Sequence, residues 1–378
     1  MEKALNGSTT VKKTLTDDFE VVIVAKAHLK KYYLNANLQT TDDPCILFEK
    51  VAKFLKEENA QITTQDFFGN CSSYTRYLSC LKQVFGEIIW PVTWIEGYGS
   101  EHDGMTGTQL YAISGVAVEP IKIDDQIVGN LFETADAQIC CLGNVLPDDV
   151  TLSNAEQTAM VFNKINSSLK LAGMDFSNVV RTWLYIDKIL DWYDDFNVVR
   201  TKFFNENNVF KGLVPASTGV GVANPANAAL VAEVLAIKKT NGNVKIAPVI
   251  SPLQCPALDY KSSFSRAVEV KFSDHRRLYV SGTASIDADG HTVHIGDVEK
   301  QIARTMEVVA AILESRQMDW NDITRSIAYF PDLSNKDLLG KYCTEMSIPH
   351  MPIAIAKGDI CRRDLLFEIE VDAVKVDV

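Results

Sequence analysis

Apolar residues recur along the chain with two spacings, one typical of helices and one typical of strands. Helical spacing predicts three helices, from Pro44 to Glu57, from Asn154 to Ala172 and from Val298 to Arg316. Alternation of apolar and polar residues predicts strands, among them Phe19 to Ala25, Arg277 to Gly282 and Leu365 to Val371. The mixture of both patterns predicts an α+β fold.

An internal repeat connects these elements. The segment Gly173 to Tyr185 realigns with Gln317 to Tyr329, 144 positions later, and Met, Asp, aromatic, β-branched, Arg and Tyr positions coincide. A helical stretch precedes each copy, and Pro215 or Pro352 later opens an apolar run that ends 21 residues beyond the proline. A fixed period of this kind is the signature of a repeated structural unit.

A third copy lies upstream. Shifting the last copy back by 261 positions, which carries Pro352 onto Pro91, sets Ile62 against Ile323 and another aromatic residue against Tyr329. Chance matches are the alternative, and they weigh most on this first copy because it shares few positions. The three copies predict three units, each reading strand, strand, helix, strand, helix, strand, strand.

The chain length agrees with three units. At roughly 150 residues per domain, a chain of 378 residues is expected to hold two to three domains. The repeat selects three, and we place the units at residues 1–115, 116–245 and 246–378. Three units that share interfaces would form one closed assembly, so we predict a monomer.

Charge and cysteine usage narrow the function classes. The chain has 37 Lys and Arg against 49 Asp and Glu, a net charge of −12, which disfavours nucleic acid or an anionic membrane as partner. A polar start and the absence of eighteen consecutive apolar residues predict a cytoplasmic protein without a membrane span. Eight scattered cysteines without a CxxC pair predict reduced thiols, mostly small buried hydrophobes, rather than disulfides or zinc ligands.

Two segments of the third unit resemble a known family. Ser263 to Val270 and Leu278 to Thr283 are similar to the opening strands of RidA (YjgF) proteins. These are chorismate-mutase-like α+β proteins that assemble as trimers with ligand clefts between subunits, so the resemblance implies a pseudo-trimer of three tandem RidA-like lobes. RidA deaminases carry an Arg just after the proline of the fifth strand, where this chain has Ser217 or Ile353. That difference argues against imine deamination, which stays as an alternative.

A resemblance to the chorismatase family covers more of the chain. Members of that family cleave chorismate to pyruvate and a six-membered-ring acid, and the resemblance implies that small-molecule substrate, no cofactor and no metal. The family's catalytic glutamate falls on Glu368. The matching segments are Arg181 to Trp183, Pro215 to Gly219, Phe264 to Ala267, Ser281 to Ser285 and Gly358 to Glu370.

The residues around Glu368 suit this chemistry. Cleavage of an enolpyruvyl ether needs a proton on the methylene carbon, and therefore a carboxylic acid that stays neutral near neutral pH. Alternation places Glu368, Glu370 and Asp372 on one strand face, where burial and mutual repulsion favour the neutral acid. Glu370 matches Glu233 in the repeat, which predicts a structural role for Glu370 and a special one for Glu368. A solvated edge strand is the alternative.

A dianionic substrate needs fixed cations. Arg181 and Arg266 are predicted to bind its carboxylates because a planar guanidinium contacts both carboxylate oxygens. The alternative is a structural donor, and Arg325, the repeat partner of Arg181, shows that the fold could require one of the pair. The remaining predicted substrate contacts are Tyr185, Ser217, Thr218, Tyr260, Gly282 and Cys361.

Cys361 and Gly282 bear on the product. Within the chorismatase family, the residues at these positions separate branches, and their identity here resembles the branch that forms 3-hydroxybenzoate. Hydrolysis to a dihydroxycyclohexadiene carboxylate and formation of another hydroxybenzoate are the alternatives. A protein that binds a metabolite without turning it over is a further competing hypothesis.

Overall fold

The computed structural model describes residues 8–38, 43–96 and 104–377, and within them the chain forms three six-stranded mixed sheets. The strand orders are β1-β2-β3-β6-β4-β5, β11-β10-β12-β9-β8-β7 and β13-β14-β15-β18-β16-β17. Each sheet therefore uses only consecutive strands of the chain and carries two helices of its own. This arrangement confirms the predicted α+β fold of three tandem lobes.

The elements are as follows. The first lobe contains β1 (Thr10–Leu15), β2 (Glu20–Lys26), β3 (Leu29–Asn37), α1 (Pro44–Glu57), β4 (Gln61–Gly69), α2 (Tyr74–Phe85), β5 (Val92–Glu96) and β6 (Met105–Ser114). The second contains β7 (Val118–Ile123), β8 (Gln126–Glu133), β9 (Ala137–Val145), α3 (Asn154–Leu171), β10 (Val179–Ile186), α4 (Ile189–Glu206), β11 (Ala216–Val220) and β12 (Leu230–Lys239). The third contains β13 (Lys245–Val249), β14 (Ala267–Lys271), β15 (His275–Ala284), α5 (Val298–Glu314), β16 (Ile323–Phe330), α6 (Lys336–Glu345), β17 (Ile353–Lys357) and β18 (Glu368–Val376).

Two details of the predicted unit need correction. Each lobe opens with an additional strand, β1, β7 or β13, which lies at a sheet edge and is largely exposed, so it carries too few buried apolar residues to give a strand pattern. The last strand begins at Glu368 rather than Leu365. The backbone N–H groups of Leu365 and Leu366 donate instead to the carbonyl of Arg362 and to the side chain of Gln301.

The lobes follow one register, as the repeat predicts. Gln65 pairs with Val92 between β4 and β5, and Ser326 pairs with Ile353 between β16 and β17, which is the same pairing shifted by 261 positions. Asp175 and Asp319 cap equivalent short 3-10 turns with the same backbone angles, φ −141° and ψ −175°. The matching residues of the repeat therefore occupy matching places in the fold.

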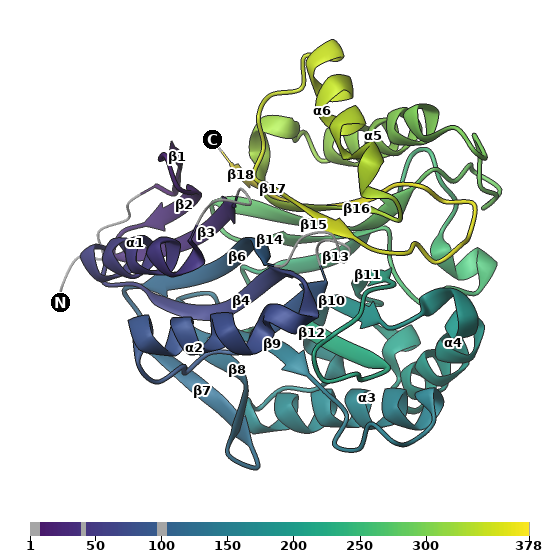
Figure 1. Cartoon of the computed structure of the whole chain (residues 1–378). Coiled ribbons are helices and arrows are strands. Elements are labelled where there is room, and N and C mark those ends of the chain that lie inside the picture. Colours follow the sequence, from purple (N-terminus) through teal and green to yellow (C-terminus); the bar gives the residue numbers. More distant parts are fainter. Residues whose placement is uncertain (1–7, 39–42, 97–103, 378) are drawn as a thin grey trace.

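The helices lie on the outside and the three sheets face one another in the interior (Figure 1). The sheets meet cyclically: β11 packs near β15, β17 near β3, and β5 near β9. An apolar cluster drawn from all three lobes, including Phe68, Tyr185 and Tyr329, fills part of the space between them. The lobes therefore form one closed ring with pseudo-threefold symmetry, and clefts arise where neighbouring lobes meet.

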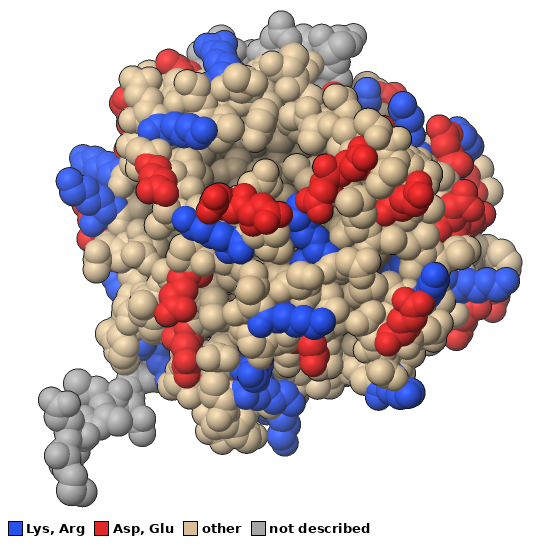
Figure 2. Space-filling view, turned by 90° about the horizontal axis from the view of Figure 1, so that it is seen from below, with Lys and Arg blue, Asp and Glu red and all other residues tan. Residues whose placement is uncertain are grey.

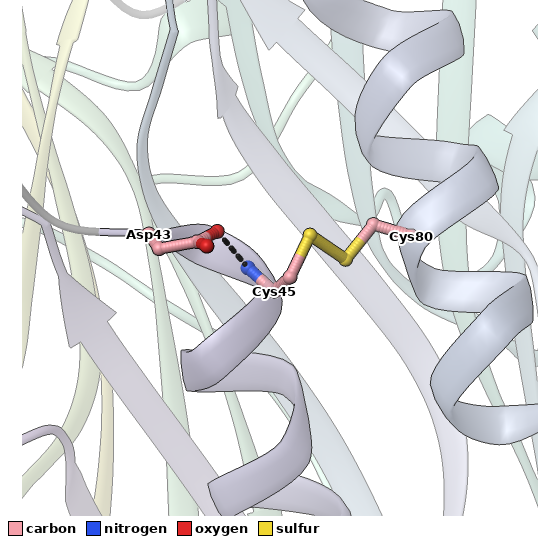
Figure 3. Close-up of a disulfide and its surroundings, with 3 residues drawn as sticks. All are labelled: Asp43, Cys45 and Cys80. Atoms are coloured by element: carbon pink, nitrogen blue, oxygen red, sulfur yellow. Dashed lines mark hydrogen bonds between the residues drawn. A yellow bond between two sulfur atoms is a disulfide. The ribbon is translucent and has the colours of Figure 1, made fainter.

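A disulfide joins Cys45 at the start of α1 to Cys80 in α2 (Figure 3). The prediction of reduced thiols is wrong for this pair, because two neighbouring helices bring residues 35 positions apart in sequence to a Cα separation of 5.8 Å. Asp43 accepts a hydrogen bond from the backbone N–H of Cys45 and so caps the same helix end. The other six cysteines are free, and Cys140 and Cys141 are buried as predicted.

The surface carries charges of both signs. On the face drawn in Figure 2, Lys and Arg side chains are interspersed with Asp and Glu rather than gathered into a basic patch. Among the helices of the described residues, none combines the length and the apolar character needed to cross a membrane.

Candidate active site

A cavity of about 830 Å³ lies where the second and third lobes meet. This volume is in the range of small-molecule sites, which typically hold about 300–1,000 Å³. The second lobe contributes α4 and β11, and the third contributes the segment before β14, part of β15 and the start of β18, so neither lobe forms the site alone. Its polar lining includes Tyr193, Asn197, Arg200, Thr201, Ser217, Tyr260, Arg266, Cys361, Arg362 and Glu368.

Glu368 is the first residue of β18 and lines this cavity with 5% of its surface exposed. Burial raises the pKa of its carboxyl to about 8, the negative charge of Glu370 adds to the rise, and Arg181 and Arg266 oppose it. At neutral pH the carboxyl is therefore mostly protonated. A protonated carboxyl in a cavity wall can act as a general acid.

Gly282 allows this carboxyl to lie directly against the backbone of β15. A Cβ atom at Gly282 would overlap Glu368 Oε1 and lie 2.9 Å from its carboxyl carbon. The pairing of β15 with β18 is irregular here, between Val280 and Thr283, and the Gly282 N–H donates to Thr218 Oγ1 at 3.0 Å. Any larger residue at Gly282 would force the acid group to move.

Glu370, two residues further along β18, has a different environment. Arg181 Nη2 donates to Glu370 Oε2 at 2.9 Å, Arg325 Nη1 donates to Oε1 at 2.6 Å, and Trp183 Nε1 also donates to Oε1, at 2.8 Å. Burial alone would raise the pKa of this carboxyl, but the two arginines outweigh burial and lower it. Glu370 is therefore an anion in the interior, as its structural position in the repeat suggests.

Three of the predicted substrate contacts lie behind the cavity wall and are not among its lining residues. Arg181 is fully buried, and its guanidinium donates to Glu370 and, at 2.6 Å, to Thr218 Oγ1. Thr218 is also buried, and its Oγ1 accepts hydrogen bonds from Arg181 Nη2 and from the Gly282 N–H. Tyr185 belongs to the apolar cluster between the lobes. The structure therefore places these three residues behind the cavity surface, and Arg181 acts on Glu368 through its charge.

Arg266, the other arginine predicted to bind a carboxylate, lines the cavity. Its Nε donates to the carbonyl of Cys255 at 3.0 Å, while Nη2 has no hydrogen-bond partner among the described residues. The guanidinium lies 5.3 Å from the ring centroid of Tyr260 and 5.6 Å from that of Phe264. Since a guanidinium has five N–H donors, most of them remain available for a carboxylate.

Two further arginines of the cavity were not predicted as ligands. Arg200 on α4 is buried, contacts the side chain of Asn197, and has an Nε without a partner in the described part of the chain. Arg362 donates to the carbonyl of Gly290 at 2.8 Å and lies 5.4 Å from the Tyr260 ring centroid. The sequence contains a signal for Arg200, because it stands four residues after Phe196 and therefore on the apolar face of the helix. A charged residue on a buried face is costly unless it binds a partner, so its presence there indicates a ligand or an ion pair.

Ser217 and Cys361 also line the cavity, on the β11 wall and on the loop before β18. Burial raises the pKa of the Cys361 thiol to about 12, and the nearby Glu368 adds to this rise. The thiol therefore stays protonated and is a weak nucleophile. Across the described residues, no three His, Cys, Asp or Glu side chains form a group suited to hold a metal ion.

The family model described as endoribonuclease L-PSP matches residues 142–238 and 256–375, which is more than half of the chain. The chain belongs to this family. The two matched segments fall within the second and third lobes, and these are the two lobes that form the cavity between them.

The chain is also similar in sequence to curated enzymes. A chorismatase of Streptomyces rapamycinicus is 27% identical over 57% of this chain and 69% of its own length. A 3-hydroxybenzoate synthase of Streptomyces hygroscopicus is 27% identical over 61% of this chain and 72% of its own. The crystal structure of a chorismatase superposes with a TM-score of 0.62 at 20% identity, covering 82% of this chain and 92% of that one. The resemblance to the chorismatase family is confirmed, and the superposition shows the shared fold.

The repeat gives each of the other two lobes a position equivalent to Glu368. Strand pairing sets Glu368 opposite Tyr329, and the corresponding pairs are Val231 with Tyr185 and Gly107 with Phe68. Gly107 lines a smaller cavity, of about 220 Å³, together with Ile353 and Ile355 of β17. Of these three equivalent positions, only the third lobe's carries an acid.

Proposed function

We propose that this chain cleaves the enolpyruvyl ether of chorismate to pyruvate and a hydroxybenzoate, with 3-hydroxybenzoate as the product. The observation that carries the proposal is a neutral glutamic acid, Glu368, in a cavity that also contains the guanidinium groups of Arg200, Arg266 and Arg362. Curated relatives named chorismatase and 3-hydroxybenzoate synthase support the same activity.

The proposed reaction begins with the O–H of Glu368, which donates its proton to the terminal methylene carbon of the enol ether. Positive charge then develops on the ether carbon, and the C–O bond to the ring breaks as pyruvate departs. The hydroxyl of the adjacent ring carbon then attacks the carbon that carried the ether and loses its proton to the Glu368 carboxylate, which forms an epoxide. Glu368 returns this proton to the epoxide oxygen as the bond to the original carbon breaks, so the oxygen moves by one carbon. Loss of the remaining hydrogen of the new oxygen-bearing carbon to the Glu368 carboxylate makes the ring aromatic and gives 3-hydroxybenzoate. Chorismate contains all the atoms of pyruvate and hydroxybenzoate, so this route consumes no water, whereas a dihydroxycyclohexadiene product would incorporate one.

The cavity arginines supply the charge that a dianion needs. Within the described chain, Arg200 Nε and Arg266 Nη2 have no hydrogen-bond partner, and the two arginines come from different lobes, on α4 and on the segment before β14. Such donors are suited to one carboxylate each, and Arg362 and Ser217 offer further contacts. Arg181 is a positioning residue in this proposal, because it holds Glu370 and acts on Glu368 electrostatically.

A direct assay tests the proposal. Purified protein is incubated with chorismate, and pyruvate and the aromatic acids are followed by mass spectrometry. We expect pyruvate and 3-hydroxybenzoate in equal amounts, and no ¹⁸O in the 3-hydroxybenzoate formed in H₂¹⁸O. A diene diol, heavier than hydroxybenzoate by one water, would replace the proposed product by the hydrolytic one, and the absence of both products would refute chorismate cleavage. An imine substrate from an aminoacrylate-generating dehydratase, tested in parallel, is expected to be left unchanged.

The closed ring of lobes also supports a monomeric enzyme, since each lobe already contacts two neighbours within the chain. Light scattering during size-exclusion chromatography is expected to give the mass of one chain, 41.9 kDa.

A further inference from the structure

A second cavity, of about 80 Å³, lies in the interior where the three sheets face one another. Its lining comes from all three lobes and includes none of the residues that line the cavity of Glu368. One end is lined by Lys31 and Tyr33 of β3, Cys141 of β9, Phe272, and Arg277 and Tyr279 of β15. We call this space the axial cavity.

Strand pairing reveals that the two cations of the axial cavity are repeat equivalents. Lys31 pairs with Ile113 on β6, and Arg277 pairs with Val374 on β18, 261 positions after Ile113. The same position in the second lobe is Ile139. Three equivalent strands therefore present one residue each toward the pseudo-threefold axis, and two of these three residues are cations.

Neither cation forms an ion pair in the part of the chain that the structure describes. Lys31 and Arg277 are each 5% exposed, and among the described residues neither forms a side-chain hydrogen bond or an ion pair. Arg277 stacks 4.4 Å from the ring centroid of Tyr33 and 5.3 Å from that of Tyr279, while Lys31 Nζ lies 5.3 Å from the ring of Phe272. Burial, followed by the charge of Arg277, lowers the pKa of Lys31 to about 7. Two buried, mutually repelling cations are costly unless an anion joins them.

The nearby carboxyl groups do not supply this anion. Asp372 also lines the axial cavity, but burial raises its pKa and its Oδ1 has no partner in the described chain. Asp66 and Asn35 both pair with Gln109 of β6. Asn35 lies four residues from Lys31 along β3, so Asp66 stands roughly 13 Å from the level of Lys31 at about 3.3 Å per residue. Glu233 lies four residues from Ile237 along β12. The charges of Asp136 and Asp274 act on Lys31, but Asp136 accepts a hydrogen bond from Asn241, and Asp274 is engaged by Lys26 and His275.

We propose that the axial cavity binds a small anion, an inorganic oxyanion or a short carboxylate, between Lys31 and Arg277. The cavity has room for only a handful of water-sized groups, so it excludes a ring acid and admits ions such as phosphate or acetate. The bound anion neutralises both cations and links the first lobe to the third, so it stabilises the closed ring. This site is separate from the cavity of Glu368 and does not depend on the proposed reaction.

The test measures anion-dependent stability. The melting temperature of the full chain is recorded against phosphate, acetate and chloride at constant ionic strength, and Kd is measured by calorimetry. We expect a saturable rise with phosphate or with acetate, which also decides between oxyanion and carboxylate. In Lys31→Met and in Arg277→Met the Kd should rise at least tenfold, while Arg277→Lys should retain binding. Phosphate also stabilises proteins by exclusion from their surface, and that non-saturating part should remain in every variant.

A neighbouring lysine provides the matched control. Lys30 precedes Lys31 on β3 but pairs with Glu58 near the surface, so Lys30→Met removes the same charge and should keep the saturable response. Glu368→Gln should keep it as well, which separates this site from the fate of the proposed reaction. A wild-type response without a saturable part, or one that Lys31→Met and Arg277→Met leave unchanged, would overturn the proposal.

Discussion

Glu368 and Glu370 stand two residues apart on one face of β18, and their surroundings keep the first neutral and the second negatively charged. The Glu368 carboxyl lies in the cavity wall against Gly282, and its pKa rises to about 8. The Glu370 carboxylate accepts hydrogen bonds from Arg181 and Arg325, and its pKa is lowered. The difference teaches that the buried anion helps to hold its neighbour neutral, because two adjacent negative charges in the interior repel each other. The negative charge of Glu370 thereby contributes to the raised pKa of Glu368.

Replacing the acid itself has the largest expected effect. Glu368→Gln keeps the size of the side chain but removes the transferable proton, so we expect the kcat for chorismate to fall by about 10²–10⁴. Steady-state kinetics with pyruvate detection measure the loss, and circular dichroism checks that the variant is folded. Undiminished turnover in this variant would contradict the role of Glu368 as the acid.

Replacing the anion tests the other half of the comparison. Glu370→Gln leaves the buried Arg181 without a carboxylate partner, while Arg325 keeps its contact with Asp66 at 3.1 Å, so we expect a loss of about 3–5 kcal/mol in the free energy of unfolding. Urea denaturation measures this loss, with Glu269→Gln as the control, because Glu269 makes only a long 3.9 Å contact with Arg276. Equal stabilities of the two variants would show that the arginine cluster does not depend on Glu370.

The same comparison explains what the sequence could and could not predict. Glu368 was recognisable because it stands among apolar residues within a long family motif, and the repeat separated it from Glu370. Arg181, Tyr185 and Thr218 were harder to assign because every residue of β10 is buried, as are most of those of β11. Alternation divides a strand into two faces, but it does not tell which of two buried faces borders a cavity.

Other features depend on contacts between distant segments. Arg200 becomes a cavity residue only because α4 of the second lobe lies against the third lobe, and no short motif records that contact. The disulfide of Cys45 and Cys80 likewise follows from the packing of α1 beside α2. The fold could be predicted because the repeat extends over the whole chain, whereas the site lies between two copies of it.

A smaller effect is expected at Gly282, which lets the carboxyl of Glu368 lie against the backbone of β15. The Cβ of Gly282→Ala would overlap Glu368 Oε1, so the carboxyl must turn away from its present position. We expect at least a tenfold lower kcat, with a changed ratio of 3-hydroxybenzoate to other products, measured by chromatography and mass spectrometry. Gly219→Ala is the control in the same cavity, since its Cβ would meet nothing closer than 3.9 Å. Equal effects of the two substitutions would remove the special role of Gly282.

The smallest expected effect is a shift of the pH profile, and it measures the coupling between the two glutamates directly. Glu368 must be protonated to act, and its pKa of about 8 predicts a kcat that is level below this pH and falls about tenfold per pH unit above it. In Glu370→Gln, the negative charge beside the acid is gone and Arg181 is freed, so both changes lower the pKa of Glu368. The decline should then begin at a lower pH than in the wild type. A profile that keeps the wild-type midpoint would mean that burial alone holds Glu368 neutral, and that the anion on β18 serves only the packing of the lobes.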